Sequence, residues 1–95
     1  MLVINKAQYS GGYNIHLVFN NGKEGVANLE RTILEDKRPI FSKLKEKSVF
    51  KDFRVEHSTV IWSEGLDLAP EYLFYLAFKG EKEFQDQFRL WGYAS

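Results

Sequence analysis

The sequence of 95 residues predicts one α+β domain: a small antiparallel sheet of hairpins with short connecting helices and a C-terminal helical tail packed on it. Three observations predict this class. Residues 13–19 alternate apolar and polar side chains, which is typical of a strand with one buried face. Residues 59–62 are β-branched or aromatic and favour a second hairpin. Residues 70–91 begin with proline and then carry apolar side chains at helical spacing.

The N-terminal part predicts paired strands. Residues 2–9 have β character and end at Ser-Gly-Gly, after which residues 13–19 form the next strand. Asn21 and Gly22 predict a type I′ turn, because both residue types tolerate positive φ. This turn pairs Leu17 with Val26, Phe19 with Glu24 and Gly25 with Val18. Val26 is then expected on the core face, and Gly25 leaves room for close packing on the other face.

Short helices are predicted between the two hairpins. Asn28 is expected to cap a helix over residues 29–36, with Leu29, Ile33 and Leu34 on its inner side. Pro39 begins a second helical turn, and Ser48 is expected to cap a third. The side chains expected to point inward from these turns are Ile40, Phe41, Leu44, Val49, Phe50 and Phe53. A second hairpin around His57 and Ser58 then joins residues 54–56 to residues 59–62.

The loop before the late helix carries two carboxylates. Asp67 is interpreted as the N-cap of that helix or as an Asx-turn just outside it, and Glu71 favours the first turn through its charge. A functional interpretation is also open. On a helix that begins at Asp67 the two carboxylates share a face, where they could perform acid–base chemistry or bind a metal.

The run W-x-x-G-x-D-L-A-P-E-x-L-F contains Trp62, Gly65, Asp67, Pro70 and Glu71, and F-N-N-G precedes it at residues 19–22. This pattern resembles a family of small bacterial domains of unknown function, number 2442. The resemblance covers about residues 2–74, which leaves residues 75–95 as a helical C-terminal extension of the single domain. It implies a compact α+β domain that occurs alone, fused to helix-turn-helix modules or encoded beside another small protein. It implies no reaction and no catalytic residues.

The C-terminal tail predicts two helices separated by Gly80. The second carries Phe84, Phe88 and Trp91 on one face, at spacings of four and three residues. We expect this apolar face to fold back on the sheet, because a small domain seldom leaves such a patch uncovered. The alternative makes these three aromatic residues the contact with a protein partner or with a second copy of the chain.

Composition excludes several functions. The chain has no cysteine, which excludes disulfides and cysteine-bound zinc. Thirteen basic and thirteen acidic residues give zero net charge, which argues against strong non-specific nucleic-acid binding. No apolar run approaches the ~20 residues of a membrane helix. We therefore expect a cytoplasmic protein with no membrane partner, no cofactor and no metal.

Residues 37–54 hold seven of the basic residues and only two acidic ones. Within this segment Lys43, Lys45, Lys47 and Lys51 are candidates for phosphate contacts, with Phe41 and Phe50 nearby. The two histidines, His16 and His57, are expected to be exposed on an outer strand face and in a turn.

These features predict a non-enzymatic bacterial interaction module, an accessory or regulatory protein that binds a small protein partner or forms a homodimer. One alternative is a nucleic-acid-linked regulator, or a toxin–antitoxin-type component, that uses residues 37–54. Another is a small enzyme that uses Asp67 and Glu71 with His16 or His57.

Overall fold

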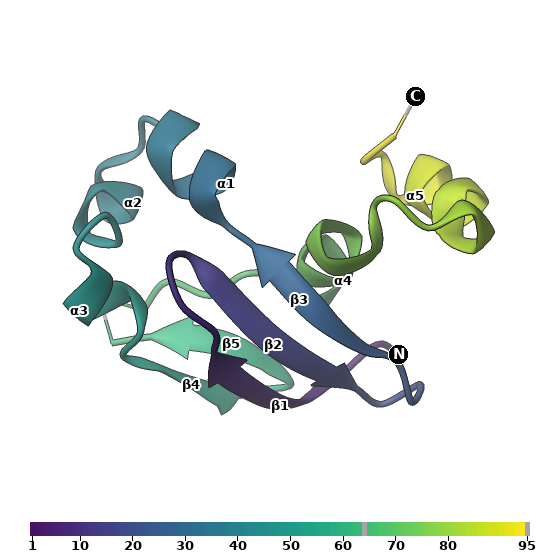
Figure 1. The fold of residues 1–95 in the computed structure, drawn as a ribbon, viewed down its shortest axis with the longest axis horizontal. Coiled ribbons are helices and arrows are strands. Elements are labelled where there is room, and N and C mark those ends of the chain that lie inside the picture. The colour runs from purple at the N-terminus through teal and green to yellow at the C-terminus, as the bar shows by residue number, and fades with distance from the viewer. Residues whose placement is uncertain (64, 95) are drawn as a thin grey trace.

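A three-stranded antiparallel sheet, in the order β1-β2-β3, lies beside the two-stranded hairpin β4–β5 in the computed structural model, which describes residues 1–63 and 65–94 (Figure 1). The strands are β1 Ile4–Tyr9, β2 Asn14–Phe19, β3 Glu24–Asn28, β4 Phe53–Glu56 and β5 Thr59–Trp62. The helices are α1 Glu30–Glu35, α2 Pro39–Lys43, α3 Lys47–Phe50, α4 Pro70–Phe78, the 3-10 turn η1 Lys82–Phe84 and α5 Gln85–Trp91. The predicted α+β class is confirmed.

The central strand β2 follows the predicted alternation. Ile15, Leu17 and Phe19 are buried, whereas the side chains between them are only half-buried on the outer face of the sheet. These three residues join a single apolar core with residues of both hairpins and of the helices. The largest fully buried side chains are Trp62, Phe19, Phe41, Phe50 and Phe88.

The hairpin between β2 and β3 has a different register from the predicted one. Gly22 alone has positive φ in this turn; its N–H donates to the carbonyl of Phe19, and the N–H of Phe19 donates to the carbonyl of Lys23. This is a three-residue loop with glycine at the left-handed position. The extra residue pairs Leu17 with Gly25 and His16 with Val26. A shift of one residue moves a side chain to the opposite face, so Val26 is 44% exposed and its predicted core position was wrong.

Helix α4 packs against β3 through Gly25. A Cβ at this position would stand 3.0 Å from Cε1 of Phe78 and 3.7 Å from the Cβ of Ala77. The predicted close approach to Gly25 is therefore confirmed, but it occurs on the core face and not on the outer face. The absent side chain lets the helix and the strand meet at this point.

The three predicted connecting helices are present, and the first, α1, is one residue shorter at each end than predicted. Leu29 precedes α1, so the predicted N-cap role of Asn28 was wrong, although the Asn28 side chain accepts a hydrogen bond from the backbone N–H of Glu30. Two further predictions were wrong. Leu34 is 52% exposed, because only Ile33 within α1 and Leu29 before it are fully buried. Ser48 lies within α3, and Glu46 precedes that helix, so Ser48 does not cap it.

The second hairpin turns tightly around His57 and Ser58. Both have positive φ, 52° and 73°, which is the type I′ geometry that glycine or asparagine usually provides. Strand β5 is buried along its whole length, and the Trp62 indole N–H donates to the Phe50 carbonyl at 2.7 Å. The predicted strand over residues 59–62 is confirmed.

The tail folds back within the same chain. Helix α4 begins at Pro70, as predicted, and α5 packs on α4, away from α2 and α3 (Figure 1). The Phe88 ring lies 5.1 Å from that of Tyr75 and 6.2 Å from that of Phe74. Lys23 of the β2–β3 turn adds a cation–π contact with Phe84. The aromatic face of α5 therefore covers α4, and α4 in turn covers the sheet.

Candidate functional site

A groove runs between α1 and α4 and contains two adjoining cavities, of about 380 and 350 Å³. Helix α4 and the residue that follows it contribute one stripe to the groove: Tyr72, Tyr75, Leu76 and Lys79. These positions share a face because side chains three, four and seven residues apart on a helix point the same way. Helix α1 supplies the facing wall of the larger cavity, with Arg31, Thr32 and Glu35, and Asp36 just beyond its end.

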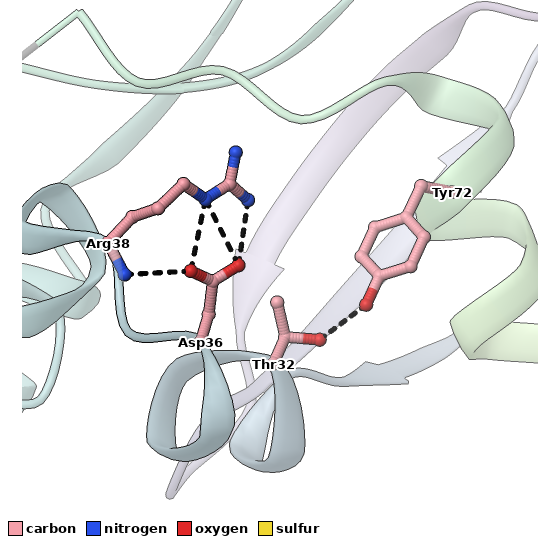
Figure 2. Close-up of polar contacts among 4 residues, drawn as sticks. All are labelled: Thr32, Asp36, Arg38 and Tyr72. Carbon is pink, nitrogen blue, oxygen red and sulfur yellow. Dashed lines mark hydrogen bonds and ion pairs between the residues drawn. The ribbon is translucent and has the colours of Figure 1, made fainter.

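The two walls meet at Thr32 and Tyr72. Their hydroxyl oxygens lie 2.6 Å apart, and either group can donate the hydrogen bond. Figure 2 shows the Tyr72 ring reaching from α4 to the Thr32 side chain on α1. Thr32, Tyr72 and Asp36 line both cavities, so this contact stands at their junction. It fixes the distance between the helices at the middle of the groove.

Asp36 is tied to Arg38 in the wall of the smaller cavity. The Arg38 backbone N–H and Nε both donate to one carboxylate oxygen at 3.0 Å, and Nη2 donates to the other at 2.7 Å (Figure 2). The hydrogen bonds from Arg38 lower the pKa of Asp36, and the carboxylate raises the pKa of Arg38. The guanidinium also lies 4.8 Å from the centre of the Phe41 ring. The pair is therefore held by bidentate hydrogen bonds, by the Arg38 backbone N–H and by the contact with the Phe41 ring.

Arg31 and Glu35 form a second pair at the rim of the larger cavity. Nε of Arg31 lies 2.8 Å from the Glu35 carboxylate, one helical turn away. This hydrogen bond is the main cause of the lowered pKa of Glu35 and of the raised pKa of Arg31. Both groups are exposed, so the pair contributes little to stability.

Three tyrosines gather beside the groove. The Tyr93 ring lies 5.6 Å from that of Tyr72 and 5.2 Å from that of Tyr75. Burial raises the pKa of the Tyr93 phenol, and the charge of Glu71 raises it further. At these distances the rings pack on one another and form a continuous aromatic surface at the edge of the groove.

The motif W-x-x-G-x-D-L-A-P-E has a structural role at several of its positions. Trp62 is buried, and Gly65 has a φ of 82° in a turn whose N–H donates to the Trp62 carbonyl. Pro70 is the first helical residue, and Ala69, not Asp67, precedes the helix. Asp67 instead forms a backbone bridge with Ile61, and its carboxylate makes no hydrogen bond within the described ranges. The predicted N-cap role was wrong, because Ala69 precedes the helix. Asp67 lies two residues outside this cap, where the Asx-turn interpretation placed it, but its carboxylate forms no Asx-turn hydrogen bond in the described residues.

The structure does not place the two candidate carboxylates, Asp67 and Glu71, on one helix. Asp67 lies outside α4, so it does not share a helix face with Glu71. Asp67 lines the smaller cavity, whereas Glu71 lines neither. His16 lies 3.5 Å from Glu24 across β2 and β3, and His57 lies in the β4–β5 turn. Within residues 1–63 and 65–94, no three His, Asp or Glu side chains gather as metal ligands.

The aromatic partner candidates on the tail pack within the chain. Phe88 is fully buried, and Phe84 and Trp91 are half-buried. Their rings surround Phe74, with centres 4.9 Å away for Phe84 and 6.1 Å away for Trp91. In this position Phe88 offers no surface to a partner.

The four lysine candidates for phosphate contacts are exposed along α2, α3 and the flanking turns. The Lys47 ammonium lies 5.5 Å from the centre of the Tyr13 ring, and the Tyr13 hydroxyl donates to the carbonyl of Lys45. None of these lysines lines the groove.

Sequence reasoning missed the groove residues Thr32, Asp36, Arg38 and Tyr72. Asp36 and Arg38 are two residues apart in a polar stretch before Pro39, a local signal for a side-chain turn. Thr32 and Tyr72 are 40 residues apart and carry no such signal. A hydroxyl–hydroxyl contact between two helices depends on tertiary packing.

The fold and the groove define a small α+β domain with an open cleft between two helices. Residues 4–79 match the family described as protein of unknown function (DUF2442), so the chain belongs to this family. The match contains every groove residue and the whole of α4, whereas residues 80–95 lie outside it. No curated protein and no solved structure matches the chain. No helix in the described part of the chain is long and apolar enough to cross a membrane.

Proposed function

We propose that this protein is a non-enzymatic binding module that holds a segment of a protein partner in the groove between α1 and α4. The observation that carries this proposal is the composition of the groove walls. Tyrosine and arginine, the residue types enriched at interaction hot spots, line a cleft that remains open on one side. Leu76 adds apolar surface, and the Thr32–Tyr72 hydrogen bond joins the two walls where the cavities adjoin.

The groove replaces the tail as the basis for an interaction function. Phe88 is buried against α4, so the apolar face of α5 is satisfied within the chain. By contrast, the side chain of Arg31 is 83% exposed at the groove rim. A partner would add contacts there without unfolding any part of the domain, which keeps the cost of binding low.

Site-specific photo-crosslinking in cells tests this function. The photoreactive residue p-benzoyl-phenylalanine replaces Arg31 at the groove rim, or Lys51 on the exposed end of α3 as the matched control. We expect one defined protein adduct from position 31 and none of the same mass from position 51. Adding Tyr72→Ala removes a groove wall and should abolish the adduct. No adduct at position 31, or an equal adduct at both positions, would refute the proposal.

A further inference from the structure

The charges that line the groove are mostly neutralised in pairs. Arg31 binds Glu35, and Arg38 binds Asp36 with both carboxylate oxygens. Two charges remain. In the described part of the chain, neither the Lys79 ammonium in the larger cavity nor the Asp67 carboxylate in the smaller one forms an ion pair.

These two remaining charges lie at opposite ends of α4. Asp67 precedes the helix, which begins at Pro70, and Lys79 follows its last residue, Phe78. The nine residues of α4 span about 14 Å along the helix axis. The groove is therefore electrically polar: negative at the N-terminal end of α4, positive at the C-terminal end, and divided at its middle by the Thr32–Tyr72 contact.

We propose that the occupant of this groove is an amphipathic helical segment of the partner that runs antiparallel to α4. This inference rests on the proposed function. The segment places an acidic side chain beside Lys79 and a basic side chain beside Asp67, about eight to ten residues further along its helix at 1.5 Å per residue. Its apolar face lies between them, against Leu76 and the rings of Tyr72 and Tyr75.

The shape of the site favours a helix over an extended segment. Residues of α1 and α4, and residues that directly follow these helices, line the larger cavity, and no residue of β1 to β5 lines either cavity. The smaller cavity also contains the loop that precedes α4, in which the backbone of Asp67 is already bridged to Ile61 of β5. An extended segment therefore finds no sheet edge to pair with, whereas a helix can lay its apolar face into the groove.

The polarity of a helix sets the direction in which the bound segment runs along α4. Helices carry acidic residues most favourably near their N-terminus and basic residues near their C-terminus. A segment that places its N-terminal acid beside Lys79 must run opposite to α4. The dipoles of the two helices then also oppose each other, which adds to the attraction.

Asp67 and Lys79 also suit the dipole of α4 itself, so the same charges have a structural explanation. For this reason the test does not depend on loss of binding in a single variant. It asks whether the order of charges in the bound segment reverses when the two charges of the groove are exchanged.

The experiment pans a phage-displayed library of 16-residue peptides against the full chain and against the Asp67→Lys/Lys79→Glu double variant. Peptides that still bind Tyr72→Ala or Ala69→Trp are removed; the first variant deletes a wall of the groove, and the second adds bulk in the smaller cavity. Thermal melts confirm that each variant is folded. We expect helix-forming peptides with an acidic residue before a basic one on the full chain, and the reverse order on the double variant.

Binding strength provides a second readout. For a peptide selected on the full chain, Asp67→Lys or Lys79→Glu alone should weaken binding roughly two- to fivefold, the range of exposed ion pairs. Three outcomes overturn the inference while the proposed function stands: groove-dependent peptides with no charge order, an order that does not reverse, or extended proline-rich peptides. Peptides resembling residues 81–94 would identify a second copy as the occupant. Enrichment of peptides indifferent to both groove variants, or no enrichment, would overturn the proposed function as well.

Discussion

The hydroxyl groups of Thr32 and Tyr72 lie 2.6 Å apart and join two helices that are 40 residues apart in the sequence. Both partners are partly buried, so each hydroxyl loses some of its water contacts when the helices pack. A partly buried hydrogen bond of this kind contributes about 1 kcal/mol to the free energy of unfolding. Removing one hydroxyl leaves the other unsatisfied, which costs more stability than removing both.

Tyr72→Phe and Thr32→Val should each lower the free energy of unfolding by about 1 kcal/mol, because each leaves one hydroxyl without its partner. The double variant should lose less than the sum of the two. Urea unfolding measures all three, and Tyr75→Phe is the control because its hydroxyl makes no hydrogen bond in the described residues. Strict additivity would show that the contact contributes nothing.

Gly25→Ala should destabilise the fold by about 1–3 kcal/mol, because the new methyl group would stand 3.0 Å from the Phe78 ring. Gly80→Ala is the matched control, since open space surrounds that position. Chemical denaturation of the two variants compares them directly. Adding Phe78→Leu to Gly25→Ala should recover part of the loss, and a failure to do so would mean that the strand backbone is the strained element.

Ser58→Gly should raise the free energy of unfolding by about 0.5–1 kcal/mol. Ser58 has a φ of 73°, which costs an L-residue roughly 1–2 kcal/mol, and glycine adopts it freely. Ser48→Gly is the control, because Ser48 lies in α3, where replacing serine with glycine should cost about 0.5 kcal/mol. Thermal melts measure both changes: the melting temperature should rise in Ser58→Gly and fall in Ser48→Gly. A loss of stability in Ser58→Gly would contradict the turn geometry.

Phe88→Ala should cost about 3–5 kcal/mol, because the ring is fully buried among the aromatic residues of α4 and η1. Leu90→Ala on the same helix removes an 82% exposed side chain and should change stability by less than about 0.5 kcal/mol. Near-ultraviolet circular dichroism should also lose intensity in the first variant only. Equal effects would show that α5 does not pack on α4 in solution.

Acid should weaken the fold partly through Asp36. Arg38 lowers the pKa of this carboxyl in the folded chain, so its stabilising effect is complete above the unfolded pKa of about 4 and is lost as the pH falls through the lowered value. Arg38→Gln should therefore lose less stability between pH 7 and pH 3 than the parent does. Urea midpoints at the two pH values measure the difference. Salt at ~1 M should reduce it, because the pair is exposed.

Local signals predicted much of the fold. The alternation of β2 and the proline at the start of α4 each act within a few residues, and both elements formed as predicted. The register of the first hairpin differs from the prediction, because one extra loop residue moves every side chain of β3 to the opposite face of the sheet. Asn-Gly is compatible with loops of two or three residues, and the choice between them depends on what packs against the strand.

The candidate site was harder to predict than the fold. Asp67 was predicted to cap a helix, to form an Asx-turn or to pair with Glu71, but its place in a cavity depends on the loop that carries it beside Arg38 and Phe41. Lys79 had no distinguishing feature in the sequence. Lys79 becomes a candidate only because the other charged residues of the groove, Arg31, Glu35, Asp36 and Arg38, form ion pairs with one another. These pairs and the lining of the groove are known only from the folded structure.

The contact between Phe78 and Gly25 also bears on aggregation. Strand β3 is the end member of its sheet, and such strands invite copies of themselves to add on. If two copies paired through β3, both α4 helices would lie on the same side of the joined sheet. The two β3 strands would then be only about 4.8 Å apart, whereas the axes of packed helices need 8–10 Å. We therefore expect the helix beneath this strand to hinder pairing of two copies through their β3 edges.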